Sequence, residues 1–218
     1  MEGLTYMAAV LWGIPVGVLS SIFTWWILWH AIAPRGQYSS EVCVFSPPPR
    51  NGGPDEMRVK FVNRSRRPLI DVSFSVFLFV PGGNEDVGSQ SLVRVPILVD
   101  EFAFIGTANK NSRVSGVLNL SYRTLVLRPD LMVPSALRRL SEPLRSFFES
   151  GDLVGFVEFC NVNTRASLQV VCSTSDGLTG ARKALVSPRY GGASFTFGKF
   201  ERGRSLKSTI VDLGGSID

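Results

Sequence analysis

The residue types that usually carry enzymatic chemistry are scarce in this 218-residue chain. Nucleophilic catalysis by Ser, Thr or Cys commonly needs a histidine base within hydrogen-bonding reach. The one histidine, His30, ends a long uncharged stretch, where a polar ring is typical of a membrane interface. Zinc needs clustered Cys and His, but Cys160 and Cys172 are far apart in sequence and lack a companion pair. We expect the cysteines to be small buried side chains.

Carboxylates are the remaining route to catalysis. Asp55/Glu56 and Asp100/Glu101 are adjacent pairs, and neighbours on a strand point to opposite faces, so neither pair is placed to share a proton. Glu158, inside an apolar run, is the one acid whose surroundings could be unusual. No glycine-rich loop has the strand-loop-helix context of a phosphate site. We therefore expect no enzymatic activity, no cofactor and no metal, and keep a carboxylate-dependent hydrolase as an alternative.

The net charge of +5 is diffuse. Every Lys and Arg follows residue 34 and only Glu2 among the acids precedes it, so the remainder carries 23 basic and 17 acidic groups. This balance fits an anionic membrane surface or an acidic partner. Nucleic acid is not expected, because aromatics such as Phe74 and Phe77 lie in core-like strands rather than among the arginines.

An uncharged stretch from Gly3 to Pro34 predicts a transmembrane anchor over residues 1–34. About 20 apolar residues suffice to cross a bilayer as a helix. Four ring-bearing residues gather at its C-terminal end, as at a headgroup interface: Trp25, Trp26, Trp29 and His30. Ala31-Ile32-Ala33 resembles a signal-peptidase site, but no basic segment precedes the run and it is long for a signal peptide. We expect the anchor to be retained.

The basic residues predict a cytoplasmic body. Arg35 and Arg50 follow the apolar stretch, and no Lys or Arg precedes it, so the positive-inside tendency places the C-terminal part in the cytoplasm. An odd number of cysteines agrees with reduced thiols. The alternative is an outward-facing or secreted ligand or adhesion module, which would expose the glycosylation sequons at Asn63 and Asn119.

Beyond a Pro/Gly-rich linker at residues 35–56, period-two alternation predicts a β-sandwich at 57–214, followed by a short tail at 215–218. The short run 42–45 is either an edge strand or linker. Because proline has no N–H for a central ladder, Pro96 predicts that its strand lies at a sheet edge or contains a bulge. Short strands separated by turns favour antiparallel pairing. The expected strands are 57–63, 69–80, 92–99, 114–127, 153–160, 166–173, 193–200 and 205–213.

Residues 133–151 interrupt the strands with helical spacing and predict two short helices. Ser135 and Ser141 are expected as N-caps and Gly151 as the stop, with Pro143 in the first turn of the second helix. Their arginines are solvent-facing or contact a lipid or partner. The same choice applies to the arginines of the turn after the first strand. The possible contact residues are Arg35, Arg64, Arg66, Arg67, Arg138, Arg139 and Arg145.

The order of these pieces resembles the cytoplasmic immunoglobulin-like domain of inward-rectifier potassium channels. MRVKFVNRSRRPLIDVSFSVFLF, residues 57–79, is similar to that family's first two strands around an Asn/Arg turn, and FGKFERGRSLKSTIVDLG, residues 197–214, to its closing segment. The chain departs from the family in having one predicted membrane helix and no filter motif between two such helices. Tyr190-Gly191-Gly192 lies in the predicted soluble part.

The resemblance implies a sandwich that assembles by symmetry, often as a tetramer, and transmits a signal to or from the membrane. It does not imply conduction. The combined expectation is a single-pass membrane protein whose cytoplasmic immunoglobulin-like β-sandwich is a non-catalytic binding, assembly or regulatory module. Its expected partners are membrane lipid and a second copy or another membrane protein.

Overall fold

The computed structural model describes residues 12–26, 33–45, 55–81, 90–107, 113–114, 117–118, 121–177 and 180–210. The chain forms two compact units, Met1–Ala33 and Pro34–Asp218. In the first unit a helix covers residues 12–26, and large apolar side chains such as Trp12, Leu19 and Phe23 are exposed on it. Residues 1–11 and 27–32 of the predicted anchor lie outside the described residues. Among the described helices, none has the length and apolar character needed to cross a membrane.

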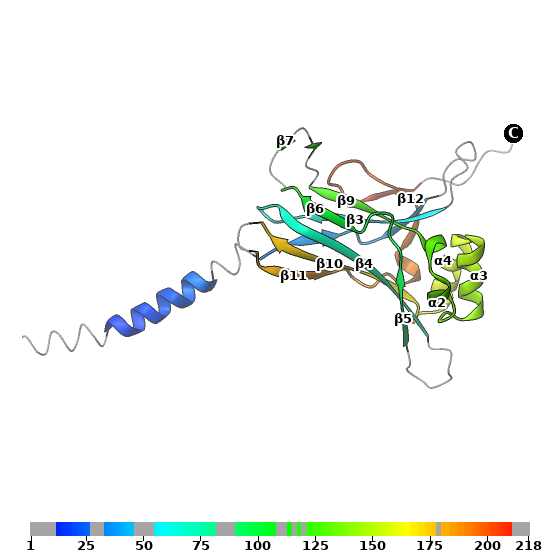
Figure 1. Ribbon diagram of the computed structural model, residues 1–218, viewed down its shortest axis with the longest axis horizontal. Coiled ribbons are helices and arrows are strands. Elements are labelled where there is room, and N and C mark those ends of the chain that lie inside the picture. The colour runs from blue at the N-terminus through cyan, green and yellow to red at the C-terminus, as the bar shows by residue number, and fades with distance from the viewer. Residues whose placement is uncertain are drawn as a thin grey trace, which may run out of the picture. The chain divides into compact units, whose positions relative to one another are not determined.

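The second unit contains a six-stranded sheet centred on β3 (Glu56–Asn63). One edge of β3 pairs with β1 (Gly36–Tyr38) and β2 (Val42–Phe45), and β3 also pairs with β9 (Tyr122–Leu127). The order continues from β2 through β12 (Phe195–Phe200) to β13 (Ser208–Ile210); Figure 1 labels β3, β9 and β12 of this sheet. Among the described strand pairs, β2 and β12 run parallel and the others antiparallel.

The second sheet is built on β4 (Leu69–Pro81), whose 13 residues span about 40 Å. Along one edge it pairs with β10 (Ser167–Asp176), which in turn pairs with β11 (Arg182–Val186). Along its other edge it pairs first with β6 (Glu101–Ile105) and then with β5 (Gln90–Val95). A separate small hairpin joins β7 (Arg113–Val114) and β8 (Val117–Leu118).

The two sheets share one hydrophobic core, which the period-two pattern anticipates. Met57, Val59 and Phe61 of β3 are fully buried. The ring of Phe61 packs edge-on against Phe74 of β4, with the centroids 5.3 Å apart. Burial of one such side chain stabilises the fold by about 1.5–3 kcal/mol. The mainly β class with two sheets is therefore confirmed.

The predicted linker contains two strands of the first sheet. Val42, Cys43 and Val44 of β2 are fully buried, and residues 46–54 lie outside the described residues. Two tyrosines attach this segment to the rest of the body. The hydroxyl of Tyr38 donates to the Leu185 carbonyl at 2.9 Å, and the hydroxyl of Tyr190 donates to the Ser39 carbonyl at 2.8 Å. Buried apolar side chains and these bonds integrate the segment into the body.

The helical insertion is confirmed at 133–151. After a 3-10 turn, η2 (Pro129–Leu131), it forms α2 (Pro134–Leu137) and α3 (Glu142–Ser150). Ser141 is the N-cap residue of α3, and Gly151 ends that helix with a left-handed φ of 73°. The predicted cap at Ser135 is wrong, because Ser135 lies inside α2, whose N-cap residue is Val133.

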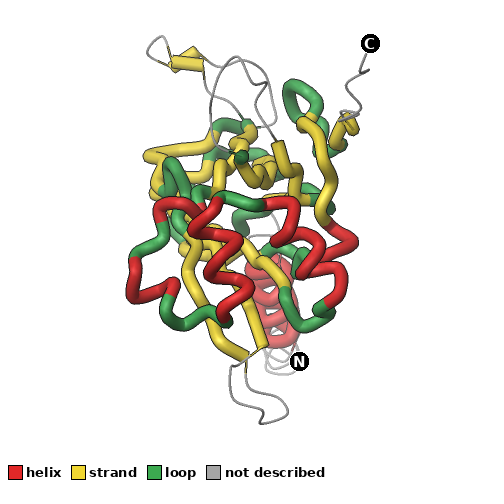
Figure 2. Tube along the Cα trace, turned by 90° about the vertical axis from the view of Figure 1, so that its right-hand side faces the viewer, coloured by secondary structure: helices red, strands yellow, loops and turns green. Residues whose placement is uncertain are grey.

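The predicted strand at 153–160 is wrong. This segment is α4 (Leu153–Val162), which Asp152 caps by accepting a hydrogen bond from the Gly155 amide at 2.9 Å. Its buried residues, Leu153, Phe156, Val157 and Cys160, follow the i, i+3, i+4, i+7 spacing of a helix. Figure 1 shows α2, α3 and α4 together at one end of the strands, and in Figure 2 this end faces the viewer. The strand that was predicted next, β10, therefore pairs with β4 and β11.

The predicted strands at 57–63, 69–80 and 166–173 are present as β3, β4 and β10, and the other four are shorter than expected. The strand expected at 92–99 is β5, which ends before Pro96 and lies at the end of its sheet, as the proline indicates. The segment 114–127 is divided between the β7–β8 hairpin and β9. The last two strands begin later than predicted, because η3 (Gly192–Ser194) precedes β12 and an irregular segment precedes β13.

Candidate functional site

The turn between β3 and β4 carries the densest group of predicted contact residues, and Asn63 organises it. The Asn63 side chain is fully buried. Its amide donates to the carbonyls of Arg67 and Gly106, each at 2.9 Å, and its Oδ1 accepts from the Ser65 amide at 2.8 Å. These bonds satisfy main-chain groups that the turn would otherwise leave unpaired. The turn is therefore held in one shape.

Arg35 joins this turn through its main chain. Its amide donates to Ser65 Oγ at 2.6 Å, and its carbonyl accepts from the Arg64 amide at 2.9 Å. Arg64 in turn donates from its guanidinium to Gln37 Oε1 at 2.8 Å. Arg35, Arg64 and Arg66 are exposed. Arginines some thirty residues apart in sequence are therefore neighbours, and one of them, Arg35, lies two residues after Ala33 in the sequence.

The hairpin of β10 and β11 brings two further cations to the same end of the second sheet. Asp176 pairs with Leu69 at the start of β4, and Gly177 packs close to Pro68. Arg182 and Lys183, opposite Ser175 and Thr174, are exposed. Sequence reasoning missed both residues, because their proximity to the turn depends on the pairing of β4, β10 and β11. We call Arg35, Arg64, Arg66, Arg67, Arg182 and Lys183 the basic end.

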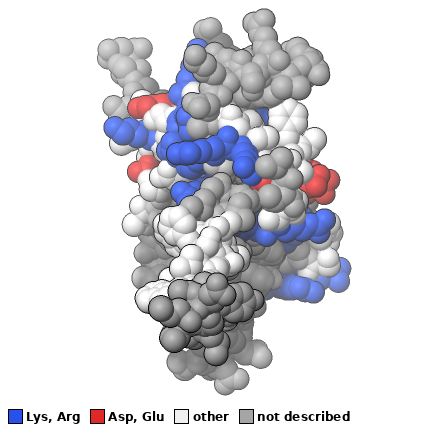
Figure 3. Space-filling model, turned by 90° about the vertical axis from the view of Figure 1, so that its left-hand side faces the viewer, with Lys and Arg blue, Asp and Glu red and all other residues white. Residues whose placement is uncertain are grey.

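Not all charges at the basic end are available to a ligand. Arg67 is half-buried and lies 3.6 Å from the carboxylate of Asp176, which is buried. Two exposed acids, Asp71 and Glu101, line a shallow cavity nearby along β4 and β6. Asp71 has a left-handed φ of 48°, where β4 carries one more residue than β10. Figure 3 views the side on which β4 begins and β10 ends, and there Lys and Arg cover more of the described surface than Asp and Glu.

Arg138, Arg139 and Arg145 lie in the helical insertion and do not join the basic end. The insertion packs near the end of β4 that pairs with β5, whereas the basic turn precedes its first residue (Figure 1). Arg138 and Arg139 are exposed, and Arg145 is half-buried, 3.7 Å from Glu142. The predicted contact residues therefore form two separate groups.

The predicted membrane-interface residues belong to the first unit. Trp25 and Trp26 end the described helix and are exposed, with the ring of Phe23 stacked on Trp26 at 6.2 Å. Trp29 and His30 lie outside the described residues.

The candidate catalytic acids are not brought together. Glu158 is exposed on α4, and Asp100 lies 3.5 Å from Arg94. Within the described part of the chain, no three Cys, His, Asp or Glu side chains are placed to hold a metal ion. Cys43, Cys160 and Cys172 are free and buried, and burial raises the pKa of each thiol to about 12. Such thiols stay protonated and unreactive at neutral pH.

The Asn63 sequon cannot carry a glycan in the folded chain. The nitrogen to which a glycan would be linked is buried and donates to the main chain of the β3–β4 turn and of Gly106. The second sequon residue, Asn119, lies outside the described residues.

No protein-family model and no curated protein matches this chain.

Proposed function

We propose that this chain is a membrane-anchored, non-catalytic binding module whose β body lies in the cytoplasm with its basic end against anionic lipid headgroups. The observation that carries this proposal is the position of Arg35. It directly follows the uncharged stretch Gly3–Pro34, and its main chain is bonded into the turn that presents Arg64 and Arg66. A body tethered at residue 34 would keep this turn close to the bilayer surface.

The uncharged stretch and its exposed apolar helix support the anchor. A helix with large exposed apolar side chains and no charged face is unusual in water. Three free, buried cysteines and the inaccessible amide of Asn63 support a cytoplasmic body over an outward-facing adhesion module, because neither a disulfide nor a glycan at Asn63 is used.

The expected strength of the lipid contact follows from its charge. A basic residue close to an anionic membrane contributes about 1 kcal/mol. Arg64 and Arg66 together therefore contribute about 2 kcal/mol, or about a thirtyfold shift in the equilibrium between the headgroup-bound and released body. The contact should weaken as salt rises, because exposed charges are screened over about 8–10 Å.

Energy transfer to labelled headgroups tests this orientation. The native thiols are buried, so a cysteine introduced at an exposed site can be labelled selectively. Ala181→Cys places a donor dye at the basic end, and Thr164→Cys places it beyond the opposite end of β10, about 30 Å away. The full chain is reconstituted in nanodiscs of phosphatidylcholine, with or without phosphatidylserine, carrying headgroup acceptors.

We expect phosphatidylserine to raise transfer from position 181 and not from position 164. Arg64→Ser with Arg66→Ser should return transfer to the level in phosphatidylcholine. The matched control, Arg138→Ser with Arg165→Ser, removes two exposed arginines elsewhere and should change nothing. Equal transfer from both positions, or no response to phosphatidylserine, would contradict the proposed orientation.

The resemblance to inward-rectifier domains supports a further part of the proposal, in which the body is immunoglobulin-like and assembles as a symmetric tetramer that passes a signal to or from the membrane. Native mass spectrometry of the full chain from detergent tests the assembly. A tetramer agrees with the proposal, and a monomer at all concentrations contradicts this part of it.

A further inference from the structure

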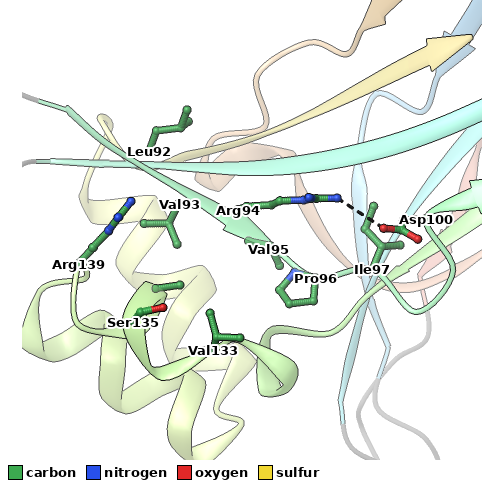
Figure 4. A pocket seen from close by; sticks show the side chains of 11 residues that line it. Leu92, Val93, Arg94, Val95, Pro96, Ile97, Asp100, Val133, Ser135 and Arg139 are labelled. Carbon is green, nitrogen blue, oxygen red and sulfur yellow. Dashed lines mark hydrogen bonds and ion pairs between the residues drawn. The ribbon is translucent and has the colours of Figure 1, made fainter.

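A groove runs along β5, at the end of β4 remote from the basic end. Its volume is about 460 Å³. One wall is formed by consecutive residues of β5, Leu92 to Val95, and the other by residues of α2 and its flanks, including Val133 and Arg139. Figure 4 shows Val93 and Val95 of β5 above Ser135 and Val133 of the other wall. In the described chain β5 pairs only with β4, so its outer edge faces the groove.

Four consecutive lining residues show that the groove follows the strand edge. Successive side chains of a strand point to opposite faces, so a cavity over one face would meet alternate residues only. Val93 and Val95 are buried in the core, whereas Leu92 is 49% exposed. The groove therefore meets the main chain of β5 as well as its side chains.

The register identifies which main-chain groups point outward. Pro81 pairs with Gln90 and has no N–H, so this pair cannot be a hydrogen-bonded one. Hydrogen-bonded and non-hydrogen-bonded pairs alternate, which makes Leu92 and Arg94 members of non-hydrogen-bonded pairs too. Their N–H and C=O groups then point away from β4. The carbonyl of Pro96 also points away from β4, as this alternation requires, because it accepts a hydrogen bond from the Arg128 amide at 2.9 Å.

Exposed apolar side chains line this groove, as Leu92 and Val133 do, or lie within two residues of its lining in sequence. Leu92, Leu98, Val99, Leu131 and Val133 are each about half exposed or more, and they come from β5, the segment after it, η2 and the start of α2. Such a concentration of apolar surface beside unpaired strand edge marks an interaction site.

The charge of the groove favours an acidic occupant. Its charged lining residues are Arg94, Arg139 and Asp100, and Arg138 lies beside them in sequence. Arg94 lies 3.5 Å from Asp100, so the remaining charge at the α2 wall is that of Arg139. A second copy paired edge to edge would bring two sets of these arginines together, and that like-charge contact disfavours self-pairing.

We propose that this groove binds an extended, acidic segment of another protein, which pairs with the outer edge of β5 as an added strand. The main-chain groups of Leu92 and Arg94 supply its hydrogen bonds, the exposed apolar side chains receive its alternate residues, and Arg139 pairs with its carboxylate. This surface is separate from the basic end, so the inference is independent of the lipid contact.

Peptide selection on the full chain in detergent tests the inference. Peptides displayed on phage are selected against the chain, and the strongest binder is synthesised and measured by fluorescence anisotropy. We expect enrichment of Asp and Glu between alternating apolar residues. N-methylation of every second peptide amide should abolish binding in one register and spare it in the other, because only one set of amides faces β5.

Two variants locate the site. Arg139→Glu should weaken binding about tenfold, since it reverses the charge that faces the carboxylate, while Arg165→Glu, an equal change at an exposed site after α4, should leave it unchanged. Leu92→Pro should abolish binding and keep the β4 ladder, because the lost N–H points outward.

Any of three peptide results would overturn the inference: no peptide enriched over the Leu92→Pro chain, equal tolerance of both N-methylated registers, or binding unaffected by Arg139→Glu. A concentration-dependent dimer that Leu92→Pro abolishes would also overturn it, because a second copy would then occupy the edge.

Discussion

The side chain of Asn63 should contribute far more to the free energy of unfolding than an ordinary polar side chain does. It is fully buried and joins the basic turn to the strand end at Gly106. Asn63→Ala removes its bonds to the carbonyls of Arg67 and Gly106 and to the Ser65 amide, and leaves these groups without that partner. The informative comparison is Asn63→Asp, which keeps the shape and the acceptor but replaces the donor with a charged oxygen.

The magnitude follows from the three lost bonds. Each unsatisfied buried group costs about 1–3 kcal/mol, and water can reach the carbonyl of the half-buried Arg67. We therefore expect Asn63→Ala to lower the free energy of unfolding by about 3 kcal/mol. In a chain of this size that corresponds to a fall in Tm of roughly 6–12 °C. Asn63→Asp should cost at least as much at neutral pH, because its carboxylate would face carbonyl oxygens.

A thiol-reactive fluorescent maleimide measures this loss in detergent, because the three native cysteines become accessible only on unfolding. The pH dependence gives a second readout. The carbonyl oxygens raise the pKa of the introduced carboxyl above its unfolded value of about 3.9, so the deficit of Asn63→Asp should shrink as pH falls toward that value and grow as pH rises. A Tm of Asn63→Asp within about 2 °C of the wild type, less than 1 kcal/mol, would refute this role of Asn63.

Other perturbations have equally definite outcomes. The native thiols should resist iodoacetamide at neutral pH, and rapid labelling of the folded chain would contradict their burial. Because burial raises their pKa from 9.0 to about 12, the free energy of unfolding should fall as pH rises between these two values. Lys60 is buried beside the Tyr122 ring, its Nζ donates to the Glu201 carbonyl at 2.6 Å, and burial lowers its pKa. Lys60→Met keeps the apolar length of the side chain but loses this bond, so it should cost less than Lys60→Ala, which should cost about 2 kcal/mol; equal losses would contradict this. Gly155→Ala should lower Tm by a few degrees, about 1 kcal/mol, because its Cβ would meet Asp152 and the Phe147 ring; an unchanged Tm would show that the cap tolerates it.

Local patterns in the sequence predict the elements whose partners are close in the chain. Met57, Val59 and Phe61 alternate with polar residues and lie in β3, and the turn after Asn63 leads directly into β4. The proline in the first turn of α3 and the glycine after its last residue mark that helix. In each case the signal comes from residues within one element and its flanks.

The other elements could not be predicted from local patterns, because they depend on pairing between distant parts of the chain. β2 is short and buried on both faces, and its parallel partner β12 lies about 150 residues later, so no local signal separates it from a linker. The segment that forms α4 is mostly apolar, as a buried strand is. The strand prediction followed this composition instead of the helical spacing of the apolar residues. Arg182 and Lys183 reach the basic end, and Arg139 reaches the groove, only through the arrangement of whole strands and helices.

Alkaline carbonate extraction of membranes from cells that express the intact chain tests whether the N-terminal stretch is a membrane anchor. We expect the chain to stay in the membrane pellet, because the uncharged stretch Gly3–Pro34 remains in the bilayer. Release of the chain into the supernatant would contradict it.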